Sequence, residues 1–574
     1  MPVKQTIKWL YSELYPFIPR LSLIILLKSV VVFSGIYMAV IAKNLIDAAV
    51  SLADSTNPIQ HNIAIHHRIT DVIKTEPSLL HNIIFYLLIM LLNLIIGMVA
   101  SFLATYLNER FDFHIRERMF NGILKTKWGE ITEYHSEDLM VRLTSDTRNV
   151  ASGLIETCTT IIVLFISLIA AFGTLFYYDR IIAIFAFSLG PLAVYFSVFF
   201  GRKIKTYQTK IQESEAKYRA FMQENIANID VIKSFSAADR MSGLLNKLYQ
   251  ERLKLVIKKN RLTIIMSSIV GLSFSLGYLG ALSWGVLKIS MNLMSFGTLS
   301  IFLSLVSRIQ TPILGLAQTV PHLASVMASA GRIMEIEDKT IENHGETIIH
   351  SNQMGIIFND VSFSYKNKTV FDRFNLSIPP GSLVAVTGTS GVGKTTLIRL
   401  LMGFVDADGG SISYYYHDKA GNELSLPVSP DIREYISYVP QGNTLFSGTI
   451  KDNILLANPD LTNEAVFNIL ESVSMLDVVA VLPEGINTQI GEKGFGLSEG
   501  QAERIAIARA MAKPAPIMIF DEATAALDEK TELTIIESIK RIKNNPTCIF
   551  ITHRRKTITL MDKEINLDDI GSLS

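Results

Sequence analysis

The chain has 574 residues, 49% of them hydrophobic and 18% charged, and its 53 Lys and Arg residues equal its 53 Asp and Glu residues in number. Such an apolar composition is unusual for a soluble enzyme of this length. The zero net charge argues against a nucleic-acid-binding protein, which carries an excess of basic residues.

The N-terminal part of the chain contains six apolar segments, each near or above the ~20 residues that cross a bilayer. They cover residues 21–46, 83–106, 154–177, 181–200, 262–286 and 296–316. A signal peptide contributes a single short apolar run, so it cannot account for this pattern. Buried helices of a soluble protein could imitate one or two such segments, but hardly six. The sequence predicts an all-α transmembrane domain of six helices over residues 21–331.

Basic residues are distributed unevenly among the segments that join these spans. Two joining segments are rich in them: Arg110, Arg116, Arg118, Lys125, Lys127, Arg142 and Arg148 follow span two, and Arg202, Lys203, Lys205, Lys258, Lys259 and Arg261 are among those that follow span four. The other joining segments hold only Arg68, Lys74, Arg180 and Lys288. Because positive loops stay inside, both basic loops and both termini are expected in the cytoplasm, and the chain in the cytoplasmic (inner) membrane.

Polar stretches next to the spans show amphipathic helical patterns. Residues 1–20, with Trp9 beside Lys4 and Lys8, predict a helix at the membrane interface. Residues 109–124 and 205–255 carry apolar residues at spacings of three and four among charges, so the spans are expected to continue as long cytoplasmic helices. Two stretches there, 125–133 and 218–231, are either ordinary amphipathic helices or, as we favour, contacts with a cytoplasmic domain.

A polar linker over residues 332–351 separates the spans from a C-terminal domain, 352–574, which is long enough for one α/β domain. The two cysteines, Cys158 in a span and Cys548 in an apolar strand, lack a partner in sequence or metal-ligand spacing. We therefore expect no disulfide and no metal cluster.

The C-terminal domain contains a phosphate-binding loop of the form GxxxxGK[ST]. It comprises Gly388, Thr389, Ser390, Gly391, Val392, Gly393, Lys394 and Thr395. The β-branched run 383–387 before it predicts a strand, and residues 396–401 after it predict a helix. In this context backbone N–H groups and a helix dipole face phosphate oxygens, Lys394 reaches the β- and γ-phosphates, and the Thr395 hydroxyl can bind Mg²⁺. The chain is predicted to bind a nucleoside triphosphate.

Further polar residues follow apolar strands of the same domain. The strand 517–520 ends in Asp521, which can orient Mg²⁺, and Glu522, which can polarise an attacking water. Gln441 lies in a loop, and His553 ends the strand 548–552. Residues 497–501, Leu-Ser-Glu-Gly-Gln, precede a helical run at 502–511.

Taken together, these motifs resemble the nucleotide-binding domain of an ATP-binding cassette (ABC) transporter. The resemblance covers the whole chain, because six spans with long intracellular loops are similar to the exporter-type membrane domain of that superfamily. Residues 488–494 and 447–454 match the exporter branch as well. The implied fold is a six-helix transmembrane domain followed by an α/β P-loop NTPase domain, and one chain is then half of a dimeric transporter.

The resemblance also implies a role for each matching residue. Tyr365 would stack on adenine, and Gly388 through Thr396 would hold the phosphates. Mg²⁺ would be bound by Thr395, Gln441 and Asp521, with Glu522 as general base and His553 as sensor of the γ-phosphate. Ser498, Gly500 and Gln501 would bind the γ-phosphate of the ATP held by the opposite subunit. Two positions depart from the family pattern: Glu499 replaces a glycine of LSGGQ, and Ala525 replaces the serine of SALD. We expect the Glu499 side chain to point away from the phosphate.

The prediction is an ATP-driven exporter of a small hydrophobic or amphipathic molecule, lipid or peptide, working as a homodimer. The alternatives are half of a heterodimer, an importer with the exporter fold, and an ATP-gated channel or regulatory subunit; a soluble ABC ATPase acting on nucleic acid is excluded by the spans.

Lys28 and Glu156 are ionisable residues within spans. Lys28 could hold an anionic group of the substrate, or it could reach the interface or pair with a carboxylate. The C-terminus is expected to be abbreviated, and no N-terminal peptidase domain is expected.

Overall fold

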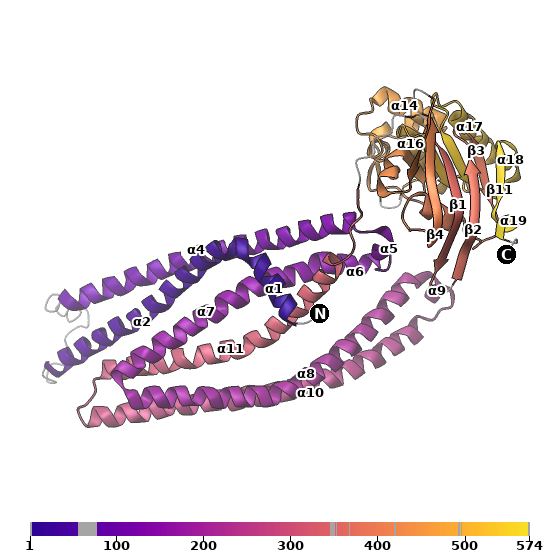
Figure 1. The fold of residues 1–574 in the computed structure, drawn as a ribbon. Helices are drawn as coiled ribbons and strands as arrows, with labels where there is room; N and C mark the ends of the chain where they lie inside the picture. Colours follow the sequence, from indigo (N-terminus) through magenta and orange to yellow (C-terminus); the bar gives the residue numbers. More distant parts are fainter. Residues whose placement is uncertain are drawn as a thin grey trace. The chain divides into compact units, whose positions relative to one another are not determined.

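The computed structural model describes residues 3–55, 77–344, 351, 353–366, 368–417, 421–491, 494 and 496–571. Arg68 and Lys74 therefore lie outside the described residues. The chain divides into two compact units (Figure 1). The helical unit comprises Met1–Gly122 and Ser136–Asp338, and the cassette unit comprises Ile123–His135 and Lys339–Ser574.

Long helices make up the helical unit, and each predicted span lies within one of them. Its elements are α1 (Val3–Leu14), η1 (Tyr15–Phe17), α2 (Ile18–Ser55), α4 (Pro77–Lys125), α6 (Ser136–Val141), the π-helical turn η2 (Arg142–Asp146), α7 (Thr147–Tyr178), α8 (Arg180–Ala227), α9 (Ile229–Ser234), α10 (Ala238–Ser290) and α11 (Phe296–Glu337). Short polar caps separate the apolar runs. The Asp179 side chain accepts hydrogen bonds from the first amides of α8, and Ser295 accepts one from Thr298 at the start of α11.

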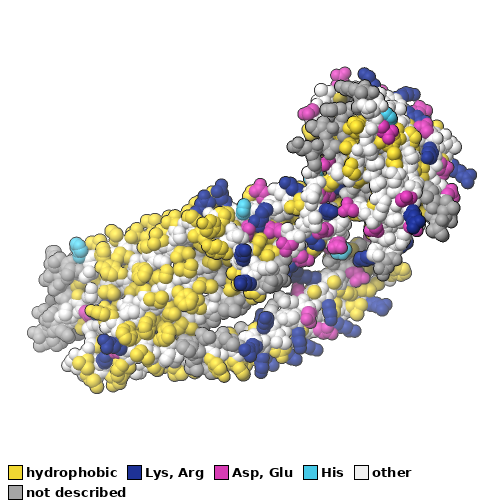
Figure 2. Space-filling model, in the orientation of Figure 1, with side chains coloured by type: hydrophobic (Ala, Val, Ile, Leu, Met, Phe, Trp, Pro, Cys, Tyr) yellow, Lys and Arg dark blue, Asp and Glu magenta, His cyan; other side chains and the backbone are white. Residues whose placement is uncertain are grey.

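The core of this unit is apolar and joins α2, α7, α8, α10 and α11. It contains Ile36, Leu175, Ile182, Ala281 and Phe302, among others. Hydrophobic side chains also cover much of the outer surface, while Lys and Arg gather along the arm formed by α8 and α10 (Figure 2). Within the described residues, four helical stretches are long and apolar enough to cross a membrane: Val3–Ser51, Leu79–Lys125, Ser136–Tyr178 and Ala238–Ser290. The predicted fourth and sixth spans lie in α8 and α11.

The N-terminal helix α1 packs on the helical unit by one face. Trp9 Nε1 donates to Glu337 at 2.9 Å, and Glu13 pairs with Arg118 at 2.5 Å. Leu10 and Leu14 are buried on this face. The opposite face leaves Val3, Ile7 and Tyr11 exposed. Its location at the membrane interface stays a prediction.

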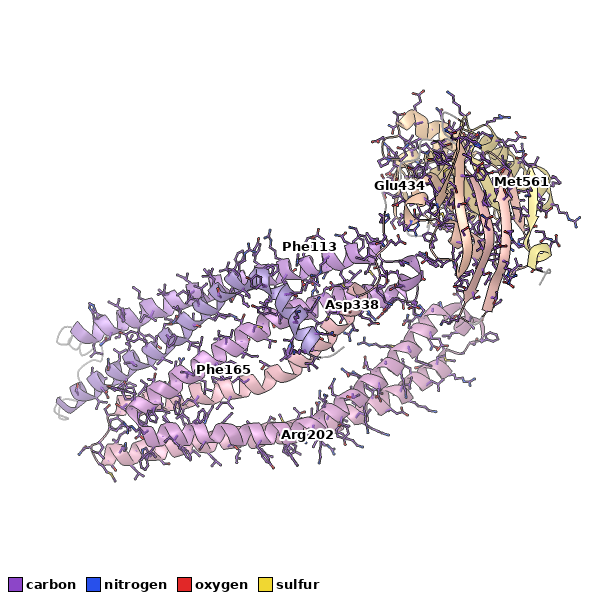
Figure 3. The ribbon with its side chains drawn as sticks, viewed as in Figure 1. Phe113, Phe165, Arg202, Asp338, Glu434 and Met561 are labelled. Carbon is purple, nitrogen blue, oxygen red and sulfur yellow. The ribbon has the colours of Figure 1, made fainter. Side chains whose placement is uncertain are left out.

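The predicted helical extensions of the spans are present. α4 continues without interruption to Lys125. The 205–255 stretch is not a single helix, because α8 ends at Ala227, the short α9 follows, and α10 begins at Ala238. Figure 3 labels Phe165 on α7 and Arg202 on α8, the latter at the point where apolar residues give way to basic ones.

Two sheets organise the cassette unit. An antiparallel sheet has the order β2 (Lys368–Ile378), β1 (Gly355–Tyr365), β4 (Gly409–His417), β5 (Glu423–Pro427), and a parallel sheet has the order β11 (Lys563–Asn566), β3 (Leu383–Thr387), β10 (Thr547–Ile551), β9 (Ile517–Asp521), β6 (Ile436–Val439). A small pair joins β7 (Gly448–Thr449) and β8 (Gln489–Ile490). The helices are α5 (Trp128–Ile131), α12 (Lys394–Leu401), α13 (Ile450–Leu455), α14 (Asn463–Ser472), α15 (Leu476–Val481), α16 (Glu499–Ala512), α17 (Glu529–Lys540), α18 (Arg555–Thr559) and α19 (Leu567–Gly571), with 3₁₀ turns η3 (Pro430–Tyr435) and η4 (Gly485–Asn487).

The parallel strands are buried on both faces, which explains why they read as continuous apolar runs. Alternate residues of β9 and β10 enter two different cores. Phe520 and Phe550 stack at 4.5 Å in the core that α13, α14, α16 and α17 complete. Ile519 and Ile549 face the other core, which contains α12 and the antiparallel sheet. The sheet is thereby held rigidly between two layers.

Candidate functional site

The predicted catalytic residues follow the carboxyl ends of adjacent parallel strands. β3 leads into Gly388, β10 leads to His553, β9 ends in Asp521 before Glu522, and β6 is followed by Gln441. Because these strands are parallel neighbours, all four ends meet at one edge of the sheet, where open α/β sheets bind ligands.

The phosphate-binding loop has the backbone that its glycines permit. Gly388, Gly391 and Gly393 have φ values of +146°, +85° and +124°. A Cβ at Gly393 would lie 2.7 Å from the side chain of Val370, so only glycine fits there. The Lys394 ammonium is largely buried and donates to the carbonyl oxygens of Gly388 at 2.7 Å and Thr389 at 3.3 Å. Those bonds hold the cation at the mouth of its own loop.

Lys394, His553, Glu522 and Gln441 are connected in a row. Lys394 Nζ lies 3.0 Å from His553 Nε2, which is 3.7 Å from Glu522 Oε1. Gln441 Nε2 donates to Glu522 Oε2 at 2.6 Å. Glu522 has a φ of +50°, unusual for a residue with a side chain, and its amide donates to Ile551 at 3.1 Å. The strand neighbour thus holds the carboxylate in a conformation that aims it at the other two side chains.

Asp521 is a buried carboxylate with the properties of a cation ligand. Burial, reinforced by the neighbouring Glu522 charge, raises the pKa of Asp521, and its carboxylate accepts a hydrogen bond from the Tyr438 hydroxyl at 3.5 Å. Adjacent carboxylates with few donors favour a bound cation. Mg²⁺ prefers oxygen ligands and is typically held by one or two carboxylates together with substrate phosphates. The oxygens of Thr395, Gln441 and Asp521 fit that requirement.

Tyr365, predicted to stack on adenine, ends β1 and is partly exposed, with Phe363 edge-on at 4.8 Å. Its hydroxyl accepts a hydrogen bond from Arg399 Nη1 at 3.1 Å. Arg399 lies on α12, directly after the phosphate loop, and its role was not predicted from the sequence. The Arg399 guanidinium also lies 4.8 Å from the Trp128 ring centre.

Trp128 belongs to the first predicted contact stretch, which is part of the cassette unit. Its ring stacks on Phe404 with centroids 5.3 Å apart, and Lys127 pairs with Asp406 at 3.0 Å. The Lys127 amide also donates to Thr340 at 2.9 Å. The structure therefore provides a direct connection from this stretch, through Arg399, to Tyr365. The predicted contact of the stretch 218–231, which lies in the helical unit, stays a prediction.

The signature residues lie at the start of α16. Ser498 accepts a hydrogen bond from the Gln501 amide at 3.3 Å, and Gln501 Oε1 accepts one from the Ser498 amide at 2.9 Å, a capping box. A Cβ at Gly500 would approach the Ala526 carbonyl to 3.0 Å, so the signature packs closely on the loop after Glu522. Ser498 and Glu499 are exposed, but the direction of the Glu499 side chain stays a prediction. Within the described residues, no hydrogen bond joins Ser498 or Gln501 to the phosphate loop of its own chain.

Asp568 is a site residue that the motifs did not indicate. Its carboxylate accepts hydrogen bonds from the Thr389 amide at 2.8 Å and the Thr389 hydroxyl at 2.7 Å. The contact arises because β11 runs parallel to β3, so the residues after both strands lie side by side. Asp568 follows the short, largely polar strand β11 by two residues, so its role becomes apparent only from the pairing of β11 with β3.

Comparisons with known proteins identify both parts of the chain. Residues 21–313 match the family described as the ABC transporter transmembrane region, and residues 371–525 match the family described as ABC transporter. The ATP-dependent lipid A-core flippase of Syntrophus aciditrophicus (strain SB) is 28% identical over 84% of this chain and 80% of its own. The protein of the same name from Desulfotalea psychrophila (strain LSv54 / DSM 12343) is 30% identical over 69% of this chain and 68% of its own.

A solved structure of a bacterial Atm1-family ABC exporter with ATP bound shares the fold, with a TM-score of 0.77, 21% identity, and coverage of 97% of this chain and 94% of that one. The two family matches together cover both units of the chain, and the cassette hydrolyses ATP to drive transport. The chain belongs to the ABC transporters, as a multi-pass half-transporter of the exporter type.

Proposed function

We propose that the chain exports a hydrophobic or amphipathic molecule, such as a lipid, a small apolar compound or a peptide, across the cytoplasmic membrane by alternating access. Both termini and the cassette unit lie in the cytoplasm in this proposal. Two relatives named as lipid A-core flippases support an amphipathic substrate. The observation that carries the proposal is the row of Lys394, His553, Glu522 and Gln441, because it places the parts needed for hydrolysis in one chain.

In the proposed reaction, phosphate oxygens replace the Gly388 and Thr389 carbonyls as acceptors for Lys394. Mg²⁺, held by Thr395, Gln441 and Asp521, would neutralise charge on the β- and γ-phosphates when bound. Glu522 takes a proton from the attacking water, while Gln441 orients the carboxylate. His553 lies close enough to both Lys394 and Glu522 to report whether the γ-phosphate is present. Tyr365 holds the adenine ring by stacking.

The second half of the ATP site comes from another subunit. Ser498 accepts one hydrogen bond within its cap, and in the described residues its hydroxyl proton is not donated to any protein group. That hydroxyl, the amides near Gly500 and Gln501, and the positive end of the 14-residue helix α16 are suited to a phosphate. We infer a homodimer, in which ATP binding closes the cassettes and hydrolysis reopens them.

The decisive experiment measures ATPase activity of this chain alone in lipid nanodiscs. Wild type is expected to turn over, and Glu522→Gln is expected to lose at least about 100-fold while still binding ATP. Glu529→Gln is the matched control, because Glu529 is an exposed acid that pairs with Lys556. A folded wild type that binds ATP but is as inert as Glu522→Gln would contradict a self-sufficient homodimer and would favour a missing partner half or a gating role. The direction of substrate movement in sealed vesicles separates export from import.

A further inference from the structure

The charges inside the predicted spans do not balance. These six segments contain three cations, Lys28, Lys43 and Arg308, and one acid, Glu156. Lys43 lies 3.7 Å from Asp47, just beyond the span. Among the residues that the structure describes, neither Lys28 nor Arg308 makes an ion pair or a hydrogen bond. Two cations within the bilayer thus have no acid of their own, although such charges are costly there and usually face a partner or a cavity.

Arg308 has a specific seat on the neighbouring helix. Its guanidinium on α11 lies against Gly35 of α2, where an added Cβ would come within 3.0 Å of Nη1 and 3.2 Å of Nη2. Gly35 is buried and Arg308 is half-buried. Both positions are near the middle of their predicted spans. A guanidinium keeps its charge under all ordinary conditions.

Glu156 is at the wrong depth to neutralise Arg308. α7 and α11 are antiparallel, with Leu164 level with Gly315 and Gly153 level with Val326. Counted from either contact, Glu156 lies fifteen residues along α7 from the position that is level with Arg308. This separation is about 22 Å along the helix axis. A two-fold axis along the membrane normal preserves depth, so Glu156 of a second copy in the proposed homodimer has the same separation.

Lys28 is a second cation, on α2. It precedes Gly35 by seven residues, two helical turns, so it lies on the same face of α2 about 10 Å away. The level of Glu156 lies about 12 Å beyond Lys28 in the same direction, toward the α2 N-terminus and away from Arg308. Two positive charges therefore lie near apolar residues such as Ile36. One is Lys28, on the face of α2 that carries Gly35, and the other is the guanidinium of Arg308.

We propose that Lys28 and Arg308 form an intramembrane binding site for a phosphate-bearing amphiphile, with Gly35 as the seat of the guanidinium. A phosphate monoester carries nearly two negative charges, which matches the two cations, and its oxygens suit the planar donors of arginine. Apolar chains would lie along α2 and α11. The inference rests on the proposed export function and names the substrate class of that transport path.

The test measures binding without ATP, by calorimetry in a neutral detergent. The probes are dioctanoyl phosphatidic acid, dioctanoylglycerol, which lacks the phosphate, and inorganic phosphate, which lacks the chains. Wild type is expected to bind the phosphatidic acid at least about tenfold more tightly than either other probe. Arg308→Gln should lose about tenfold and Lys28→Gln about threefold, while Lys43→Gln, the control cation that has an acid partner, should bind as wild type.

Two further variants separate recognition from folding. Gly35→Val keeps both charges but displaces the guanidinium, so it should weaken binding of the phosphatidic acid, and Arg308→Lys should retain part of it. Equal affinity for phosphatidic acid and dioctanoylglycerol, or unchanged binding by Arg308→Gln and Gly35→Val, would overturn the site. Equally tight binding of inorganic phosphate would overturn the assignment to an amphiphile. Because no nucleotide is used, these results are independent of the Glu522→Gln comparison, which tests the motor.

Discussion

The phosphate-loop edge and the signature end of the cassette unit differ in whether their predicted site residues already contact one another. The phosphate-loop edge comprises Gly388 through Thr396, Gln441, Asp521, Glu522 and His553, and the signature end comprises residues 497–501 with the loop 525–528. At the edge, Lys394, His553, Glu522 and Gln441 already contact one another. At the signature end, the side-chain hydrogen bonds of Ser498 and Gln501 to other described residues are those that cap their own helix.

This difference has a physical meaning. A row of oppositely charged and polar groups at one sheet edge is suited to bind a nucleoside triphosphate and to hydrolyse its β–γ phosphoanhydride bond. The N-terminus of α16, with the Ser498 hydroxyl as a donor, can bind an anion but provides no general base for hydrolysis. We therefore treat the two regions as halves of one site that come from different subunits, and the predictions below are ordered by the size of the expected effect.

The strongest test combines a defect at each region in separate copies. Lys394→Ala and Ser498→Arg should each lower ATPase activity by at least about 100-fold. When the two copies are co-expressed, each mixed dimer has one site with both lesions and one intact site. Random pairing should then restore about a quarter of wild-type activity.

The matched control combines Lys394→Ala with Glu522→Gln, two lesions at the same edge. Every site in that mixed dimer lacks either the lysine or the base, so no recovery is expected. Recovery in the control, or none in the Lys394→Ala with Ser498→Arg mixture, would contradict the division of the site between subunits.

A second prediction concerns the contact that connects Trp128, through Arg399, to Tyr365. The Arg399 guanidinium contacts the Trp128 ring and the Tyr365 hydroxyl together, which a lysine cannot reproduce. Arg399→Lys or Trp128→Ala should raise the KM for ATP about threefold to tenfold, as loss of a cation–π contact predicts. ATPase rates against ATP concentration measure this. Trp128→Phe keeps an aromatic ring, so its KM for ATP should stay close to that of wild type. Arg541→Lys, at the C-cap of α17 where the guanidinium pairs with Glu537, is the control.

A third prediction concerns the acceptor beneath the loop. Asp568→Ala removes both hydrogen bonds to Thr389, and because Thr389 is exposed, water replaces them in part. The KM for ATP should rise about twofold to fivefold with kcat nearly unchanged, and Asp568→Asn should have a smaller effect since its amide oxygen keeps one bond. Asp569→Asn, one residue later on α19, should behave as wild type. An equal fall in kcat for both Asp568 variants would contradict a positioning role.

The strand ends that carry the predicted cassette residues could be located from the sequence, because each follows a short apolar run or a local motif. Strands 383–387 and 517–521 and the helix after Lys394 were all located from short runs of β-branched residues and glycines. Once the strands are parallel, the meeting of Lys394, Glu522 and His553 follows from topology. The helical extensions were likewise predicted, except that the break into α8, α9 and α10 carries no proline signal.

Other features required three-dimensional pairing. Arg399 reads as an ordinary basic residue on a short helix, and only folding places it between Trp128 and Tyr365. Asp568 lies beside Thr389 because β11 pairs with β3, which joins residues 179 positions apart in the chain. Arg308 became significant only when its position against Gly35 and its distance from Glu156 were known. Such long-range contacts are set by packing, and periodicity contains no record of them.

The smallest predicted effect lies at the signature end and depends on pH. Glu503 of α16 accepts a hydrogen bond from the Ala526 amide at 3.0 Å, and burial, aided by the Glu499 charge, raises the pKa of Glu503. A raised folded-state pKa means that this group favours the folded state most below its unfolded value of 4.5, and that the contribution is lost as pH rises through the folded value. Glu503→Gln keeps the acceptor but removes the charge. At pH 7.5 it should therefore raise the free energy of unfolding by less than about 1 kcal/mol, seen as a slightly higher Tm. This difference from wild type should disappear toward pH 4.5. Glu464→Gln on α14 is the control, and a lower Tm for Glu503→Gln at both pH values would show that the ionised carboxylate is needed to hold the loop after Glu522 against the signature.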